Sequence, residues 1–157
     1  MLPEFPSLPG TYALFLTLSA PAKLTIGKLG AFAFPTGEYV YTGSARGPGG
    51  VGARLRHHLR PAQRPHWHID YLRTRAVVTG GVYVVQEEVS TGSMPLECAW
   101  SQALLALPGA SVPVQGFGAS DCACHCKAHL VKINQSIDVL NKLRADGGGE
   151  VMHWTVP

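Results

Sequence analysis

Nine consecutive residues near the N-terminus, Gly10–Leu18 (GTYALFLTL), constrain the fold more than any other stretch. They are rich in Tyr, Leu, Phe and Thr and carry no charge, which predicts a strand buried on both faces and therefore central in its sheet. Further strand-like stretches at residues 24–29 and 38–42 follow after short connections. A parallel crossover needs a dozen residues or more, so we expect antiparallel neighbours.

Helices and further strands follow from spacing and from breaker residues. Val51, Leu55 and Leu59 recur at helical spacing after the glycine-rich loop 47–50, and Pro61 ends that helix. A second helix is predicted from an N-cap at Ser93 to about residue 107, and a third over residues 136–145 with Ser136 as N-cap. Strands are expected over residues 77–86, 129–134 and 151–156, with residues 30–35 as a connection.

These elements predict an α/β (α+β) fold in which a small, mainly antiparallel sheet is flanked by helices. The chain has 157 residues, of which 46% are hydrophobic and 15% charged, so it can bury a core as one domain and is not disordered. We find no apolar run long enough to span a bilayer and no basic segment typical of a signal peptide. The expected location is cytoplasmic, with no membrane partner.

Positive charge is concentrated in the middle of the chain. Residues 46–75 contain seven of the thirteen Lys and Arg residues, all seven of them arginine, against one acid, Asp70. Guanidinium groups bind phosphate through paired hydrogen bonds, so this block suits nucleic acid or a phosphorylated ligand. The alternative is a solvated helix face matched by counter-ions. The candidate nucleic-acid-binding cations are Arg46, Arg56, Arg60 and Arg64.

Arg54 and His58 are four residues apart and therefore share one face of the predicted helix. Each lies one position from the buried stripe, which places both at the boundary between core and solvent. There they would suit a phosphate site, although two polar residues at this spacing also occur on ordinary surface helices.

Two further groups of polar residues have metal-ligating chemistry. If residues 66–70 are extended, His66, His68 and Asp70 share one face; if they are helical, His66 and Asp70 do. Either arrangement is a candidate metal pair. A polar network that supports the arginine-bearing helix is the favoured interpretation. Glu97 opens a later helix, where a carboxylate complements the helix dipole or ligates a hard divalent cation.

Three of the four cysteines lie within residues 120–129 (SDCACHCKAH). Cys122, Cys124, Cys126 and His129 supply enough donors for a zinc site, although this spacing differs from the usual C-x-x-C knuckle. A thiol nucleophile with His129 and Asp121 is a second interpretation, and small packing residues a third.

The order of these motifs resembles the GIY-YIG nuclease superfamily. One strand carries Gly10-Thr-Tyr12, a later strand carries Tyr41-Thr-Gly43, a helix with Arg54 and His58 follows, and Glu97 opens another helix. Residues 66–72 (HWHIDYL), 97–99 (ECA) and 117–122 (FGASDC) make the chain look most like a small stand-alone branch labelled a domain of unknown function. The resemblance covers about residues 9–133.

This resemblance implies a metal-dependent endonuclease, with DNA expected ahead of RNA. Tyr12 and Tyr41 would line the site, and Arg54 would hold the scissile phosphate and stabilise developing charge. Glu97 would ligate one Mg²⁺ or Mn²⁺ ion. A tyrosine would activate water, with His58 as its helper or as an alternative base.

Gly43 and Ser44 would approach the nucleic-acid backbone at the end of the second motif strand. The chain departs from the family pattern in having Gly-Thr-Tyr as its first motif, Tyr-Thr-Gly as its second, and an apparent insertion at Gly47–Gly50. We identify no separate DNA-targeting domain in this sequence, so the module is expected to bind weakly or to need a protein partner for targeting. The alternatives are a binding module of the same fold without turnover and a Cys/His metal-binding structural protein.

Overall fold

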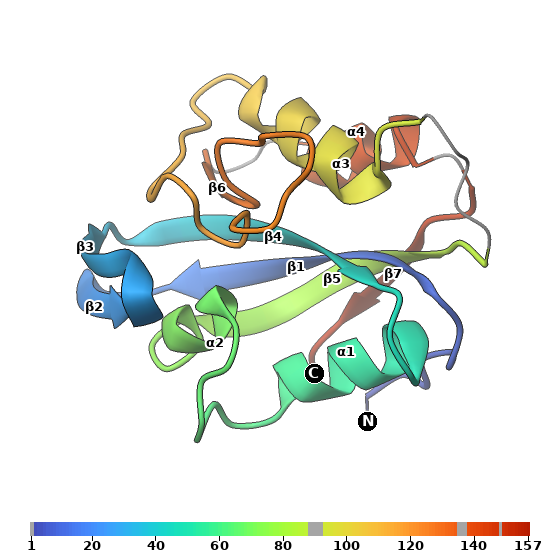
Figure 1. Ribbon diagram of the computed structural model, residues 1–157, viewed down its shortest axis with the longest axis horizontal. Coiled ribbons are helices and arrows are strands. Elements are labelled where there is room, and N and C mark those ends of the chain that lie inside the picture. Colours follow the sequence, from blue (N-terminus) through green and yellow to red (C-terminus); the bar gives the residue numbers. More distant parts are fainter. Residues whose placement is uncertain (1, 88–92, 135–137, 148) are drawn as a thin grey trace.

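The computed structural model describes residues 2–87, 93–134, 138–147 and 149–157, and it is organised around a five-stranded sheet (Figure 1). The strand order is β6-β4-β1-β5-β7, and each of these pairings is antiparallel. The predicted α+β fold with a mainly antiparallel sheet is therefore confirmed. The strands are β1 (Gly10–Leu18), β4 (Gly37–Ala45), β5 (Val77–Val85), β6 (Leu130–Ile133) and β7 (Met152–Thr155).

Helices cover both faces of the sheet. Helices α1 (Gly50–Leu59) and α2 (His68–Leu72) lie on one face, and α3 (Leu96–Leu105) and α4 (Val139–Ala145) lie on the other (Figure 1). No helix in the described part of the chain is both long enough and apolar enough to span a membrane.

The central position predicted for Gly10–Leu18 is confirmed. All nine residues of β1 pair with β4 on one side, and eight of them pair with β5 on the other. Successive side chains point to opposite faces, so Tyr12 and Leu14 pack toward α1 and α2 whereas Ala13 and Phe15 pack toward α3 and α4. This strand therefore contributes to two cores at once.

A small hairpin lies beside α2, where the sequence predicted one strand and a connection. Strands β2 (Ala22–Ile26) and β3 (Gly30–Phe34) pair with each other around a 3₁₀ turn, η1 (Gly27–Leu29). The prediction that residues 30–35 form a connection was wrong. The reversal depends on Gly27 and Gly30, whose φ angles of 48° and 122° are readily adopted only by glycine.

The helix predicted after the glycine-rich loop is confirmed as α1, and the N-terminal arm is attached to its first turn. The backbone N–H of Val51 donates to the carbonyl of Leu8 at 2.8 Å, and that of Gly52 donates to Pro6 at 2.8 Å. At Gly50 φ is 56°, and a Cβ atom there would lie 2.2 Å from the carbonyl oxygen of Leu8. This close approach requires glycine.

One of the two predicted helix caps differs from the structure. Helix α3 begins at Leu96 after Pro95, so Ser93 is not its N-cap, and it ends at Leu105. Ser136 lies outside the described residues. Helix α4 begins after Asp138, whose carboxylate accepts a hydrogen bond from the backbone of Asn141.

A polar network around Asp70 joins α2 to α1, as predicted, but its side-chain partners are His57 and Arg73, whereas His66 contributes only its backbone and His68 bonds to Gly118. The side chain of Asp70 is only 2% exposed, and it accepts hydrogen bonds from His57 Nε2 at 3.0 Å and from Arg73 at 3.2 Å. The backbone N–H groups of His66 and Trp67 also donate to it. Burial raises the pKa of Asp70, but the hydrogen bonds from Trp67, His66 and His57 outweigh burial and hold the pKa below its ordinary value.

We expect Asp70→Ala to lower the free energy of unfolding at pH 7 by about 3–5 kcal/mol, because it leaves the nearly buried Arg73 cation and two backbone donors without their partner. In the wild type this contribution is present above about pH 5. It is lost as pH falls below the unfolded-state value of about 3.9 and through the lower folded-state pKa.

Urea titrations at pH 7 and pH 3 measure both effects. The matched control is Asp146→Ala, at an exposed position next to α4, which should change stability by less than about 0.5 kcal/mol. Equal losses in the two variants would contradict a special role for Asp70.

Candidate active site and its neighbouring Cys/His group

A pocket of about 630 Å³ lies where the pairing of β4 with β6 ends. Strand β6 pairs with residues 38–41 of β4, so Thr42–Ala45 continue beyond it along the edge of the sheet. Residues from both helical layers meet around this end of β4. The predicted catalytic and nucleic-acid-binding residues that line the pocket are Tyr12, Tyr41, Gly43, Ser44, Arg54 and Glu97, and the predicted zinc donors Cys122, Cys124 and His129 also line it.

Tyr12 reaches this pocket because its neighbour across the sheet is Gly43. The two residues are paired in the β1–β4 register, and a Cβ atom on Gly43 would lie 2.5 Å from the Tyr12 hydroxyl. Gly43 does not end its strand as predicted, since β4 continues to Ala45. The space created by its missing side chain accommodates the Tyr12 ring.

His58 forms a hydrogen bond with the Tyr12 hydroxyl, with 2.8 Å between the hydroxyl oxygen and His58 Nε2. We expected both Arg54 and His58 at the boundary between core and solvent. Arg54 is partly exposed, but His58 is only 1% exposed and is not among the residues that line the pocket. In either tautomer of His58, the phenol oxygen of Tyr12 keeps a lone pair for a water molecule in the pocket.

Burial keeps the site's histidine and tyrosines uncharged. Burial, together with the nearby Arg73 and His57, lowers the pKa of His58 to about 3. Burial also raises the pKa of Tyr12 and of Tyr41 well above the ordinary value. The positive charge of Arg54 opposes the increase for both tyrosines.

The guanidinium of Arg54 stacks on the ring of Trp67, 4.2 Å from the ring centroid. Within the described part of the chain, its N–H groups make no hydrogen bond. Trp67 also packs against His57, with ring centroids 4.7 Å apart, and its backbone N–H donates to Asp70. The sequence did not predict that Trp67 supports Arg54, because an aromatic residue beside histidines is equally typical of a packed core.

Glu97 enters the pocket from the first turn of α3, where the helix dipole favours a carboxylate. The exposed residue Asp121 lines the same pocket from the segment between α3 and β6. Sequence reasoning considered Asp121 only beside a thiol nucleophile. Two carboxylates with room for water are the donor set that Mg²⁺ prefers.

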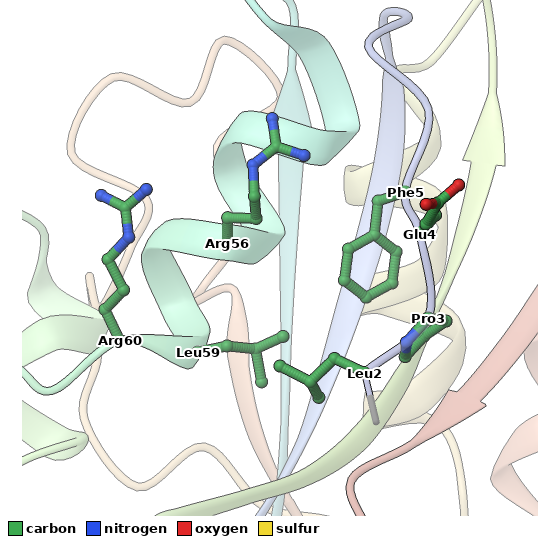
Figure 2. Close-up of a pocket in the computed structure, with 7 residues that line it drawn as sticks. All are labelled: Leu2, Pro3, Glu4, Phe5, Arg56, Leu59 and Arg60. Atoms are coloured by element: carbon green, nitrogen blue, oxygen red, sulfur yellow. The ribbon is translucent and has the colours of Figure 1, made fainter.

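The predicted nucleic-acid-binding arginines do not form one surface with Arg54. Arg56 and Arg60 line a second pocket of about 520 Å³ on another side of α1, together with Leu59 and the N-terminal arm (Figure 2). Arg46 donates to the backbone carbonyl of Gln86, and Arg64 is exposed in the connection after α1. The helical twist separates Arg54 from Arg56 because residues two apart point in different directions.

The predicted metal pair in residues 66–70 is not assembled. His68 Nδ1 accepts a hydrogen bond from the backbone of Gly118 at 2.8 Å, and His66 contributes its backbone N–H to Asp70. His57, His58 and Asp70 do come together, but the Asp70 carboxylate is already bound by Arg73 and by two backbone N–H groups.

A Cys/His group that could hold a metal ion borders the pocket. Its members are Cys98, Cys122, Cys126 and His129, and their ligand atoms lie within 4.8 Å of one another. The predicted set contained Cys124 in place of Cys98. The sequence did not predict Cys98 as a ligand, because it lies 24 residues before Cys122. Its position on the buried face of α3 brings its sulfur next to that of Cys122.

Thiol protonation differs within this group. Burial raises the pKa of Cys98 above its ordinary value. Burial also raises the pKa of Cys122, but backbone N–H groups of Cys126 and Cys124 outweigh that effect and hold the pKa below its ordinary value. Backbone donors aimed at a sulfur favour its thiolate, the form that binds metals.

Comparison with protein families matches residues 11–147 to the family described as a domain of unknown function, DUF123. The chain belongs to this family. Comparison with curated proteins gives no match, and comparison with solved structures gives none. The family carries no assigned activity, so membership of the GIY-YIG superfamily stays a prediction.

We expect the His58 imidazole to remain neutral from pH 8 to pH 5 in the folded protein, because burial lowers its pKa to about 3. The unfolded-state value is about 6.5, so protonation favours unfolding and this histidine makes stability fall as pH drops below about 6.5. Histidine NMR titration measures the pKa, with the signal assigned from its loss in His58→Gln. A His58 signal that titrates near pH 6.5 would contradict the buried position.

Proposed function

We propose that this protein is a metal-dependent endonuclease that hydrolyses phosphodiester bonds of nucleic acid, with DNA as the expected substrate. One observation carries the proposal. Tyr12, Tyr41, Arg54 and Glu97 were selected by their resemblance to GIY-YIG nucleases, and they line one pocket although β1, β4, α1 and α3 each contribute one of them. Residues without a shared role would rarely converge in this way from four elements.

Arg54 supplies the phosphate-binding charge in this proposal. Stacking on Trp67 restrains the guanidinium plane while its N–H groups remain available to a ligand in the pocket. A guanidinium forms two parallel hydrogen bonds with phosphate oxygens and stabilises the charge that develops there during hydrolysis.

Tyr12 orients the attacking water, and His58 acts through Tyr12 as a positioning residue. The 2.8 Å hydrogen bond to the neutral His58 holds the phenol oxygen at the pocket wall. In hydrolysis the water oxygen bonds to phosphorus and loses a proton, the P–O3′ bond breaks and the leaving oxygen takes up a proton, so the protein gains no net proton. The raised pKa of Tyr12 favours the neutral phenol, so its oxygen accepts a hydrogen bond from water rather than acting as a phenolate.

Glu97 would hold Mg²⁺ or Mn²⁺, with Asp121, which lines the same pocket, as a second oxygen donor. Such an ion supplies positive charge to the leaving oxygen. The thiolate-rich group beside it suits a softer cation such as zinc, and it does not supply the hydrolytic metal in this proposal.

A nucleic-acid-binding module without turnover is the second candidate. The raised pKa values of Tyr12 and Tyr41 favour it, because they make a tyrosinate base costly near neutral pH. In that case Arg54 and the other arginines would contribute to binding while no bond is cleaved.

We expect the purified protein to cleave branched, nicked or single-stranded DNA with Mg²⁺ or Mn²⁺, and Arg54→Ala and Glu97→Gln to reduce the rate by about 10²-fold or more. Arg54 loses contacts that are strongest at the transition state, and Glu97 loses its metal-binding charge. Single-turnover cleavage of end-labelled DNA measures the rates.

The matched controls are Arg144→Ala and Glu150→Gln, which change the same residue types at exposed positions outside the pocket. Both controls should cleave at the wild-type rate. Salt-dependent DNA binding without cleavage in either metal would favour the binding module instead. An equal loss of cleavage rate in the control variants and the site variants would show that the pocket has no special role in cleavage.

A further inference from the structure

We propose that Cys98, Cys122, Cys126 and His129 bind a structural zinc ion that joins the start of α3 to the segment of residues 119–129. This segment forms one wall of the pocket, and it carries Asp121. The inference concerns a site other than the proposed Mg²⁺ or Mn²⁺ site, and it does not depend on nuclease activity.

The distances among the four donor atoms are close to those of a tetrahedral zinc site, and the longer ones would shorten slightly when the ion binds. Cys98 Sγ lies 3.5 Å from Cys122 Sγ and 4.0 Å from His129 Nε2, and all four ligand atoms lie within 4.8 Å of one another. Tetrahedral zinc with bonds of about 2.3 Å to sulfur places its ligand atoms about 3.5–3.8 Å apart.

The donor types select the metal. Three thiol sulfurs and one imidazole nitrogen prefer zinc over Mg²⁺ or Mn²⁺, which bind mainly to oxygen. Four protein ligands fill a tetrahedral coordination shell and leave no position for a catalytic water. Zinc sites of this kind stabilise folds rather than catalyse hydrolysis.

The local backbone brings the distant ligands together. A turn with a hydrogen bond from His125 N–H to the Cys122 carbonyl reverses the chain, and His125 adopts a φ of 54°, which is uncommon outside glycine. This reversal returns Cys126 toward Cys122. At the far end, the N–H of His129 donates to the carbonyl of Phe117 at 2.8 Å, which fixes His129 where β6 begins.

Helix α3 supplies both a ligand and a supporting donor. Gln102 lies four residues after Cys98 and therefore on the same face of α3, where its side-chain amide donates to Cys126 Sγ at 3.8 Å. Hydrogen bonds to ligating atoms orient them and tune metal affinity. Glu97 directly precedes Cys98, so a zinc ion here would also fix the backbone that presents Glu97 to the pocket.

Metal content and spectroscopy of the full chain test this proposal. We expect zinc at one equivalent per chain in the wild type, and a cobalt-substituted protein with the absorption of tetrahedral Co²⁺ bound by three thiolates. Cys98→Ser should lose this zinc, whereas Cys124→Ser should keep it, because Cys124 lies in the same segment but outside the ligand group. Gln102→Ala should fold and weaken zinc affinity by about tenfold.

Several outcomes would overturn the proposal. One is zinc retained in Cys98→Ser but lost in Cys124→Ser, which would restore the ligand set predicted from sequence. Others are a wild type without zinc, a Cys98–Cys122 disulfide in freshly purified protein, or a cobalt spectrum with fewer than three thiolates. If Cys98→Ser fails to fold, the cobalt spectrum of the wild type and the zinc affinity of Gln102→Ala still test the proposal. None of these measurements uses DNA, so their outcome is independent of nuclease activity.

Discussion

The buried carboxylate of Asp70 connects the parts of the molecule that present Arg54. It accepts hydrogen bonds from His57 on α1 and from the backbone of Trp67, the N-cap residue of α2. Trp67 in turn stacks against the Arg54 guanidinium. A buried charge is stable only when its partners surround it, so the carboxylate fixes the relative position of two helices and, through them, the cation at the pocket.

The site lies at the end of β4 that extends beyond its pairing with β6. Strand β6 ends its pairing with β4 at Tyr41, and α1 and α3 approach this edge from opposite faces of the sheet. Tyr12 therefore contacts His58 on one side of the sheet while Glu97 reaches the same pocket from the other layer. The depth available to Tyr12 depends on Gly43, because any larger residue would occupy the space of its ring.

Two kinds of metal-ligand chemistry meet at the start of α3. Glu97 offers a hard oxygen donor to the pocket, and the next residue, Cys98, offers a soft sulfur donor to a different ligand group. Successive residues of a helix point about 100° apart, so one turn serves both sites without mixing their ligands. A structural ion at Cys98 would restrain the residue proposed to hold the hydrolytic ion.

Sequence alone determined the central strand, the antiparallel sheet and helix α1, because each depends on local spacing, charge or composition. It also selected Tyr12, Tyr41, Arg54 and Glu97 as pocket residues through their order along the chain. Hairpin β2–β3 was not predicted, because strands of five residues are too short to show a clear alternation of apolar and polar residues.

Only the tertiary structure decided two further features: the burial of His58 and the entry of Cys98 into the Cys/His group. Burial and ligand geometry depend on contacts between residues far apart in the chain. Spacing along the sequence fixes direction within one helix or strand, but it does not fix how one element packs on another.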